Sequence, residues 1–175
     1  MDYASMVERR RALRIAPYKT LAEVDFDGDW ITPLQITSRA MDGPVLIALH
    51  WLEEDAIRRN SQVLKKLGYL PAIPFNKVLD HALTMAGLSR QQIYLTQAFH
   101  LVPRKRSEDV PKSLVDLSFD EVTKHELGQR RVIALGGGAA GACKRHGIDH
   151  VATCHPSRRG WSFEQRARDI ASALL

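Results

Sequence analysis

Four short segments of the sequence carry side chains that could bind and activate a substrate. They are His50-Trp51, Gln97 to His100, Gly136 to Gly138, and His155 to Arg159. Three of the four contain histidine, which donates or accepts a proton near neutral pH. Each segment directly follows a short apolar run of the kind that forms a buried strand. The chemistry predicted for these segments is therefore acid, base or hydrogen-bond catalysis.

The charge of the chain favours an anionic binding partner. The chain has a net charge of +5 and a sequence pI of about 9.4, which favours a polyanion such as nucleic acid. Two of its basic clusters fall in loops expected to edge one cleft. The clusters are Arg9-Arg10-Arg11, Arg104-Lys105-Arg106, Arg130-Arg131, Lys144-Arg145 and Arg158-Arg159.

The apolar runs that position these residues alternate with helical segments. The runs cover 45–49, 93–96, 132–135 and 151–153. Such alternation predicts an α/β fold, a three-layer sandwich with a central four-stranded parallel sheet. Ligands of these sheets bind beyond the carboxyl ends of the strands. All four chemical segments are therefore expected at one edge of the sheet.

Capping patterns indicate where the helices begin. We expect Ser5 with Glu8, Ser118 with Glu121, and Ser162 with Gln165 to form capping boxes. Further helices are expected over about 53–67 and from about Lys77 to Ala86, the latter with Asn76 as N-cap.

Length and composition limit the class of protein. With 175 residues, 45% of them hydrophobic, the chain suits one soluble domain over 1–175, with 1–43 as an N-terminal extension packed on it. Asp27, Asp29 and Trp30 of that extension are either surface turn residues or contributors to the site. The sequence contains no apolar run long enough to span a membrane and no secretory signal, so a cytoplasmic monomer is expected.

Three stretches together resemble the uracil-DNA glycosylase superfamily, particularly its small single-domain bacterial branches. The similarity covers about 44–175 and depends on the order of the motifs. The stretches are Pro74-Phe75 with Ala86-Gly87-Leu88, Ile93 to Gln97 and Pro103; Val132 to Gly136; and His155-Pro156-Ser157.

The resemblance implies hydrolysis of the N-glycosidic bond of uracil, or of another deaminated or damaged base, in DNA. Such an enzyme flips the base out of the duplex and begins base excision repair. By resemblance, His155 donates a hydrogen bond to the departing base. The implied substrate-binding residues are Phe75, Gln97 and Trp51, and the implied DNA-binding residues are Ser157, Arg158, Arg159 and His100.

Two positions depart from the family pattern. Gln97 stands where relatives have Asn to read the uracil edge, which favours a broader choice of bases. Relatives also follow the first strand with a glycine-rich loop that bears an acidic or amide residue, whereas this chain has His50 there. His50 is the catalytic candidate at that point, with Glu53 and Glu54 as alternatives.

No cofactor is expected. Relatives with an iron–sulphur cluster use four cysteines, and this chain has only Cys143 and Cys154.

Two other functions remain open at this point. The small residues from Gly136 to Ala142 could hold a nucleotide phosphate, although the Walker lysine is missing. The chain could also be a non-catalytic protein of the same fold that binds DNA or a nucleobase, since the usual first motif is absent.

Overall fold

Four short apolar segments form the parallel sheet at the centre of the molecule, in a computed structural model that describes residues 2–175. The strands are β1 (Val45–Ala48), β2 (Tyr94–Gln97), β3 (Val132–Leu135) and β4 (Val151–Thr153). Their order is β2-β1-β3-β4, and all three neighbouring pairs are parallel. The predicted four-stranded parallel sheet is confirmed.

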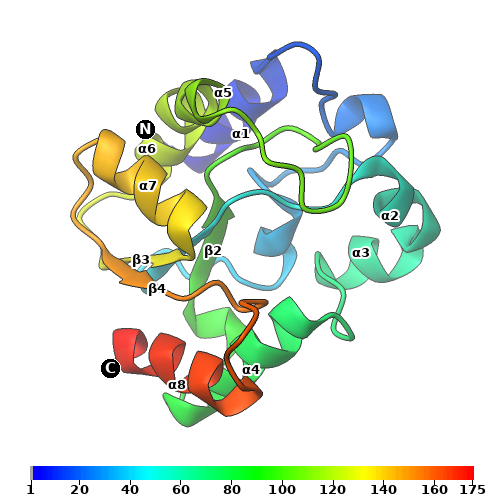
Figure 1. The fold of residues 1–175 in the computed structure, drawn as a ribbon. Coiled ribbons are helices and arrows are strands. Elements are labelled where there is room, and N and C mark those ends of the chain that lie inside the picture. The colour runs from blue at the N-terminus through cyan, green and yellow to red at the C-terminus, as the bar shows by residue number, and fades with distance from the viewer. Residues whose placement is uncertain (1) are drawn as a thin grey trace.

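Helices cover both faces of this sheet (Figure 1). Val45 and Ile47 of β1 pack with α1, α5 and α7, whereas Leu46 between them packs on the other face with α3, α4 and α8. This alternation creates two cores and confirms the three-layer α/β prediction. The helices are α1 (Tyr3–Ala12), α2 (Glu54–Arg59), α3 (Ser61–Leu67), α4 (Pro74–Met85), α5 (Lys112–Ser118), α6 (Lys124–Glu126), α7 (Gly137–Arg145) and α8 (Phe163–Leu174).

Several helix starts differ from the sequence prediction. Asp2, rather than Ser5, caps α1, because its carboxylate accepts the Ser5 N–H. Helix α4 begins at Pro74, so Asn76 lies inside it as a buried residue and is not its N-cap. The segment expected to be one helix over 53–67 divides at Asn60 into α2 and α3.

The helical segment before β3 is longer than predicted. It starts at Lys112 and continues through a π-helical turn (Phe119–Thr123) into α6. Ser118 lies within this run, and its hydroxyl accepts the backbone N–H of His100 instead of capping a helix. The capping box of Ser162 and Gln165 at the start of α8 is confirmed.

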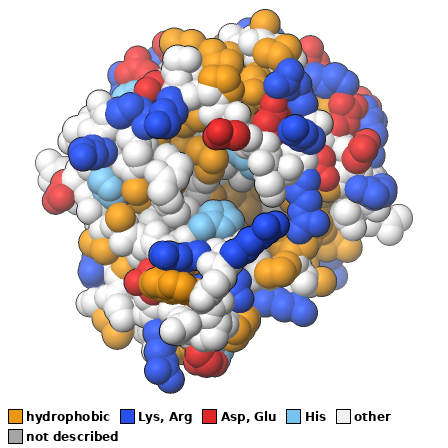
Figure 2. All heavy atoms as spheres, in the orientation of Figure 1, with side chains coloured by type: hydrophobic (Ala, Val, Ile, Leu, Met, Phe, Trp, Pro, Cys, Tyr) orange, Lys and Arg blue, Asp and Glu red, His pale blue; other side chains and the backbone are white. Residues whose placement is uncertain are grey.

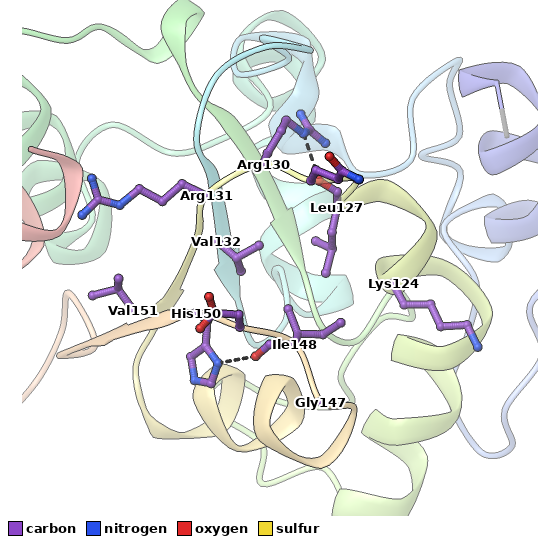
Figure 3. Close-up of a pocket in the computed structure, with 12 residues that line it drawn as sticks. Lys124, Leu127, Arg130, Arg131, Val132, Gly147, Ile148, His150 and Val151 are labelled. Carbon is purple, nitrogen blue, oxygen red and sulfur yellow. Dashed lines mark hydrogen bonds between the residues drawn. The ribbon is translucent and has the colours of Figure 1, made fainter.

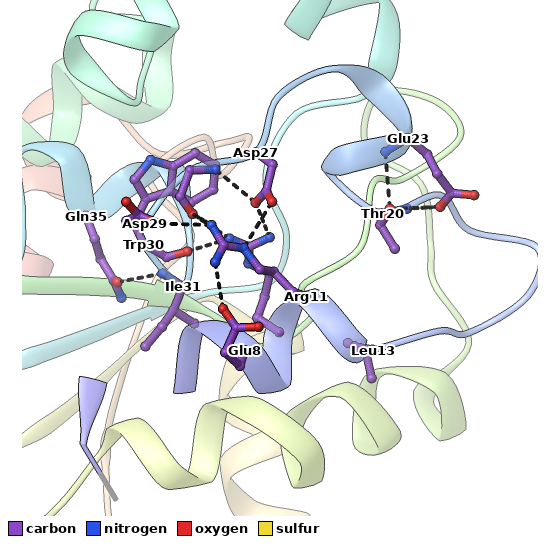
Figure 4. Close-up of polar contacts among 12 residues, drawn as sticks. Glu8, Arg11, Leu13, Thr20, Glu23, Asp27, Asp29, Trp30, Ile31 and Gln35 are labelled. Atoms are coloured by element: carbon purple, nitrogen blue, oxygen red, sulfur yellow. Dashed lines mark hydrogen bonds and ion pairs between the residues drawn. The ribbon is translucent and has the colours of Figure 1, made fainter. Parts of the chain in front are cut away.

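The turn that follows residue 24 is tied to α1 by ion pairs (Figure 4). Buried Arg10 donates to Asp27 at 2.6 Å and to the carbonyl oxygen of Trp30 at 2.7 Å. Arg11 pairs with Asp27 and Asp29, both at 3.0 Å. Asp27, Asp29 and Trp30 therefore stabilise the packing of this turn on α1 and do not line the pocket described below.

Both cysteines are free and buried. Burial raises the pKa of the Cys143 and Cys154 thiols to about 11, so both are protonated near neutral pH. Within residues 2–175, no helix combines the length and the apolar character needed to cross a membrane.

Candidate active site

A cavity of about 430 Å³ opens at the carboxyl edge of the sheet, and we call it the carboxyl-edge pocket. Figure 2 shows a hollow with an apolar floor on this face, with a histidine at its margin and Lys or Arg side chains beside it. The chain segments after β1 and β4 meet there, together with the start of α4 and the loop after β2. Its lining includes Leu34, Leu49 to Glu53, Tyr69, Leu70, Ile73, Phe75, Asn76, Arg106 to Asp109, Leu135, Gly138, His155 and Ser157.

His155 follows β4 at the margin of the pocket. Its Nδ1 accepts the backbone N–H of Ser157 at 3.0 Å, so the proton of the neutral ring is on Nε2. Surrounding protein atoms lower the pKa of His155, even though the residue is exposed at the pocket mouth, and the nearby His50 lowers it further. The ring is thereby kept as a neutral hydrogen-bond donor.

Phe75 lies opposite His155 on the pocket wall. It is in the first turn of α4, which starts at Pro74 because proline favours the first position of a helix. The two ring centroids are 5.4 Å apart and the planes meet at 63°, so the edge of one ring meets the face of the other. An aromatic wall and a hydrogen-bond donor therefore stand at the same opening.

His50 follows β1 and is held by two main-chain oxygens. Its Nδ1 lies 3.0 Å from the carbonyl oxygen of Trp51, and its Nε2 lies 3.1 Å from that of Glu108. Neither nitrogen therefore has a lone pair directed at the pocket. Trp51 is buried and donates its Nε1–H to the carbonyl oxygen of Gly68 at 3.1 Å, and it also lines the pocket.

Two neighbouring glutamates differ in their surroundings. Glu53 lines the pocket, and it precedes the first residue of α2 without a side-chain hydrogen bond that caps that helix. Glu54 points elsewhere, accepting from Lys19 at 2.6 Å and Arg58 at 2.9 Å. These hydrogen bonds lower the pKa of Glu54. Of this pair, Glu53 is the carboxylate that can face a substrate.

The loop after β2 forms a pocket wall that sequence reasoning missed. Glu108 is 5% exposed and accepts from the Arg104 backbone N–H at 2.6 Å, the Arg104 guanidinium, and the Tyr18 hydroxyl at 3.3 Å. Burial raises the pKa of Glu108, but the hydrogen bonds from Arg104 outweigh it and the net pKa is lowered. The sequence offered one indication of this pocket wall, namely the acidic residues that follow the Arg104-Lys105-Arg106 cluster.

Residues 65–174, more than half of the chain, match the family model of the Uracil DNA glycosylase superfamily. This chain belongs to that superfamily. No curated protein matches the sequence significantly. Members of the superfamily are generally DNA glycosylases. The matched span includes Phe75 and His155, whereas His50 and Glu53 precede it, in the region where the sequence departs from the family pattern.

Two residues that the uracil-DNA glycosylase resemblance assigned to the site lie elsewhere. Gln97 is 2% exposed, and its amide accepts from Thr32 and donates to the carbonyl oxygen of Phe99, both at 3.0 Å. His100 is 1% exposed, with Nε2 3.1 Å from the Thr123 hydroxyl and 3.4 Å from Glu126. Neither side chain reaches the pocket or the surface in this structure, since buried polar groups hold both.

Of the predicted DNA-binding residues after His155, Ser157 lines the pocket, and Arg158 and Arg159 follow it in the chain. Ser157, Arg158 and Arg159 are exposed, and the Arg158 N–H donates to the His155 carbonyl oxygen at 2.8 Å to close a turn. The Arg158 guanidinium stacks over the Trp161 ring, 4.1 Å from its centroid. Arg106 also lines the pocket, from the loop after β2. This arrangement is typical of a phosphate-binding margin.

A second cavity, of about 460 Å³, lies at the amino edge of β3 and β4 (Figure 3). Arg130, Arg131 and His150 line it, and it contains none of the predicted site residues. Superfamily membership and the clustering around His155 favour the carboxyl-edge pocket as the site. Residues 2–175 hold no group of three or more His, Cys, Asp or Glu side chains arranged for a metal ion. The two cysteines also cannot supply the four thiolates of an iron–sulphur cluster.

Proposed function

We propose that this protein is a monofunctional DNA glycosylase that hydrolyses the N-glycosidic bond of uracil, or of another deaminated or damaged base, in DNA. The product would be an abasic site that enters base excision repair. The observation that carries the proposal is the state of His155, whose Nδ1 accepts the Ser157 N–H, which leaves an Nε2–H donor at the mouth of the pocket.

The flipped base enters the pocket against Phe75. Base–aromatic stacking is worth about 1–3 kcal/mol and depends little on the identity of the base. The Nε2–H of His155 donates to a carbonyl oxygen of the base. This bond strengthens as negative charge develops on the base, and comparable donors contribute about 3–4 kcal/mol to the transition state. Because Gln97 is held by Thr32 and Phe99, hydrogen bonding by that amide does not restrict the pocket to uracil.

Water must then be directed at the sugar carbon. Glu53 suits this role because it is an acidic residue that lines the pocket, whereas both nitrogens of His50 already face carbonyl oxygens. The bond between C1′ and the base nitrogen breaks, and the base leaves with its electron pair. The water oxygen bonds to C1′, and its proton passes to Glu53 and later to solvent or to the released base.

DNA itself would lie across the pocket mouth. Ser157 and Arg106 line the pocket, and Arg158 and Arg159 follow Ser157 in the chain. The three arginines can neutralise phosphates near the flipped nucleotide, which makes binding depend on salt concentration.

A strand-cleavage assay tests the proposal directly. Oligonucleotides with a single uracil, hypoxanthine or xanthine are incubated with the protein, as single strands and as duplexes, and abasic sites are cleaved with alkali. We expect release of at least one of these bases. His155→Ala should lower the single-turnover rate about 100- to 1,000-fold. His150→Ala, at the other end of the sheet, is the matched control and should retain the parental rate.

The absence of any base release, with tight binding to the same oligonucleotides, would favour the alternative of a non-catalytic DNA- or nucleobase-binding protein. The unusual first-strand loop, with His50 in place of an acidic or amide residue, is the observation behind that alternative.

A further inference from the structure

Both ring nitrogens of His50 face hydrogen-bond acceptors. Nδ1 lies 3.0 Å from the carbonyl oxygen of Trp51, and Nε2 lies 3.1 Å from the carbonyl oxygen of Glu108. A carbonyl oxygen only accepts, and a neutral imidazole has only one N–H. With a neutral ring, one nitrogen lone pair would point at an oxygen lone pair. With a proton on each nitrogen, both contacts are good hydrogen bonds.

We propose that His50 is held as an imidazolium cation that acts through its charge and not as a general base. The bond from Nε2 to the Glu108 carbonyl oxygen also joins the segment after β1 to the loop after β2, so the cation fixes two walls of the pocket relative to each other. Charge-assisted hydrogen bonds are roughly twice as strong as neutral ones, which favours this protonation state further.

The charged groups that line the pocket are compatible with a positive charge on His50. Glu53 lies on the same segment as His50, and Asp109 faces the pocket from the loop after β2. The Glu108 carboxylate is largely neutralised by Arg104. The other titratable or cationic groups that line the pocket are Tyr69, Arg106 of the same loop and His155 after β4. Two acidic residues that line the same pocket can offset the His50 charge, and His50 lowers the pKa of His155.

A cation at His50 has two consequences. It disfavours a second positive charge at His155, which preserves the Nε2–H donor in its neutral form. It also stabilises a base that departs as an anion and repels a base that carries a positive charge before cleavage. This second consequence rests on the proposed glycosylase function. It defines the substrate class as bases with an acidic imide or lactam group, and excludes cationic alkylated purines.

Nitrogen-15 NMR of the full chain with labelled histidine tests the protonation state without any substrate. The two ring nitrogens of His50 should both show the shifts of protonated nitrogens at pH 7.5. The spectrum of His50→Gln assigns the signals. A neutral His50 ring with one unprotonated nitrogen at pH 7.5 would overturn the proposal.

The effect on His155 gives a second measurement. Replacing His50 by Gln removes the neighbouring charge that lowers the pKa of His155, so the titration midpoint of His155 should rise. His150→Gln, matched in chemistry but at the amino edge, should leave it unchanged. An unchanged midpoint in His50→Gln, in a variant whose amide spectrum shows the native fold, would also overturn the proposal.

The substrate class is tested with three oligonucleotides that contain uracil, hypoxanthine or 7-methylguanine. We expect no release of 7-methylguanine, and a rate of release of an acidic base that falls about tenfold in His50→Gln. Release of 7-methylguanine as fast as uracil would contradict the charge argument. If no base at all is released, the proposed function fails, while the two NMR measurements still decide the state of His50.

Discussion

Gly136 and His155 lie against each other where β3 and β4 end. A Cβ atom on Gly136 would come within 2.9 Å of the His155 Cβ and 3.2 Å of its Cα. Gly136 also has a φ of +94°, a conformation that other residues rarely adopt, and its N–H donates to the Thr153 carbonyl oxygen at 3.0 Å. The position of the proposed catalytic histidine therefore depends on a glycine about twenty residues earlier.

Gly136→Ala should displace the His155 ring and lower glycosylase activity. The clash involves backbone and Cβ atoms that cannot move aside easily, and the positive φ adds strain of about 1–3 kcal/mol. We expect a loss of tenfold or more in the single-turnover rate, since small misplacements of catalytic groups are costly. Urea unfolding and the uracil-release assay measure the two effects separately.

Gly137→Ala is the control for that substitution. A Cβ on Gly137 would meet nothing within 4 Å, and the residue begins α7 with ordinary helical geometry. Its activity should equal that of the parent, with a stability change within about 1 kcal/mol. Equal activities of the two alanine variants would refute the supporting role of Gly136.

Glu53→Gln should slow base release strongly while leaving DNA binding intact. The amide keeps the shape of the side chain but cannot take a proton from water, so we expect a fall of about 100- to 10,000-fold in the single-turnover rate. Glu54→Gln tests the specificity of this effect, because Glu54 pairs with Lys19 and Arg58 away from the pocket. Its rate should stay within about twofold of the parent, and a similar loss in both variants would argue against catalysis by Glu53.

The pH dependence of base release should follow His155 on its acid side. Protonation of Nδ1 would remove the acceptor of the Ser157 N–H and disturb the donor geometry at Nε2. Desolvation and the nearby His50 lower the pKa of His155 below its ordinary value of 6.5, so the active neutral form persists to a lower pH. The acid limb of kcat/KM should therefore have a midpoint below 6.5, and a midpoint above 7 would contradict this assignment.

The lowered pKa of His155 also makes the free energy of unfolding depend on pH. A histidine whose pKa is lower in the folded state binds its proton more weakly there than in the unfolded chain. Its contribution therefore lowers the free energy of unfolding as pH falls below 6.5 toward the folded pKa, and has no effect at higher pH. His155→Gln should show a shallower decrease of stability between these limits in urea titrations.

Local patterns were sufficient to predict the sheet and much of the pocket. The four strands are short apolar runs, and parallel strands place their carboxyl ends at one edge. That rule alone predicts that His50, Glu53 and His155 lie near one another. Phe75 was assigned to the pocket from a family resemblance, and the chain's membership of that superfamily supports the resemblance.

The orientations of Gln97 and His100 could not be predicted in this way. Both follow β2, but their hydrogen-bonding partners are distant in the sequence. Thr32 holds Gln97 from a segment without regular periodicity, and Thr123 holds His100 from the π-helical turn. Burial of a polar side chain depends on such long-range partners, which no local pattern reveals. The wall around Glu108 is likewise fixed by Tyr18, far from it in sequence.

Glu126 is the centre of a buried polar cluster beneath that part of the sheet. Its carboxylate accepts from Gln35 at 3.0 Å, from Tyr94 at 2.7 Å and from Thr96 at 2.8 Å. Burial is the largest cause that raises the pKa of Tyr94 well above its ordinary range, and the negative charge of Glu126 raises it further. The phenol therefore stays protonated and donates. The cluster joins the N-terminal segment, the sheet and α6.

Glu126→Gln should therefore destabilise the fold strongly although it preserves side-chain volume. The new amide places N–H groups against donors and removes a buried charge that satisfied three of them, and we expect a loss of about 3–5 kcal/mol in urea unfolding. Glu121→Gln is the matched control, since Glu121 is exposed and pairs only with Arg9 at 3.0 Å. That change should cost less than about 1 kcal/mol. If the two variants unfold at the same urea concentration, the buried cluster does not stabilise the attachment of the N-terminal segment to the sheet.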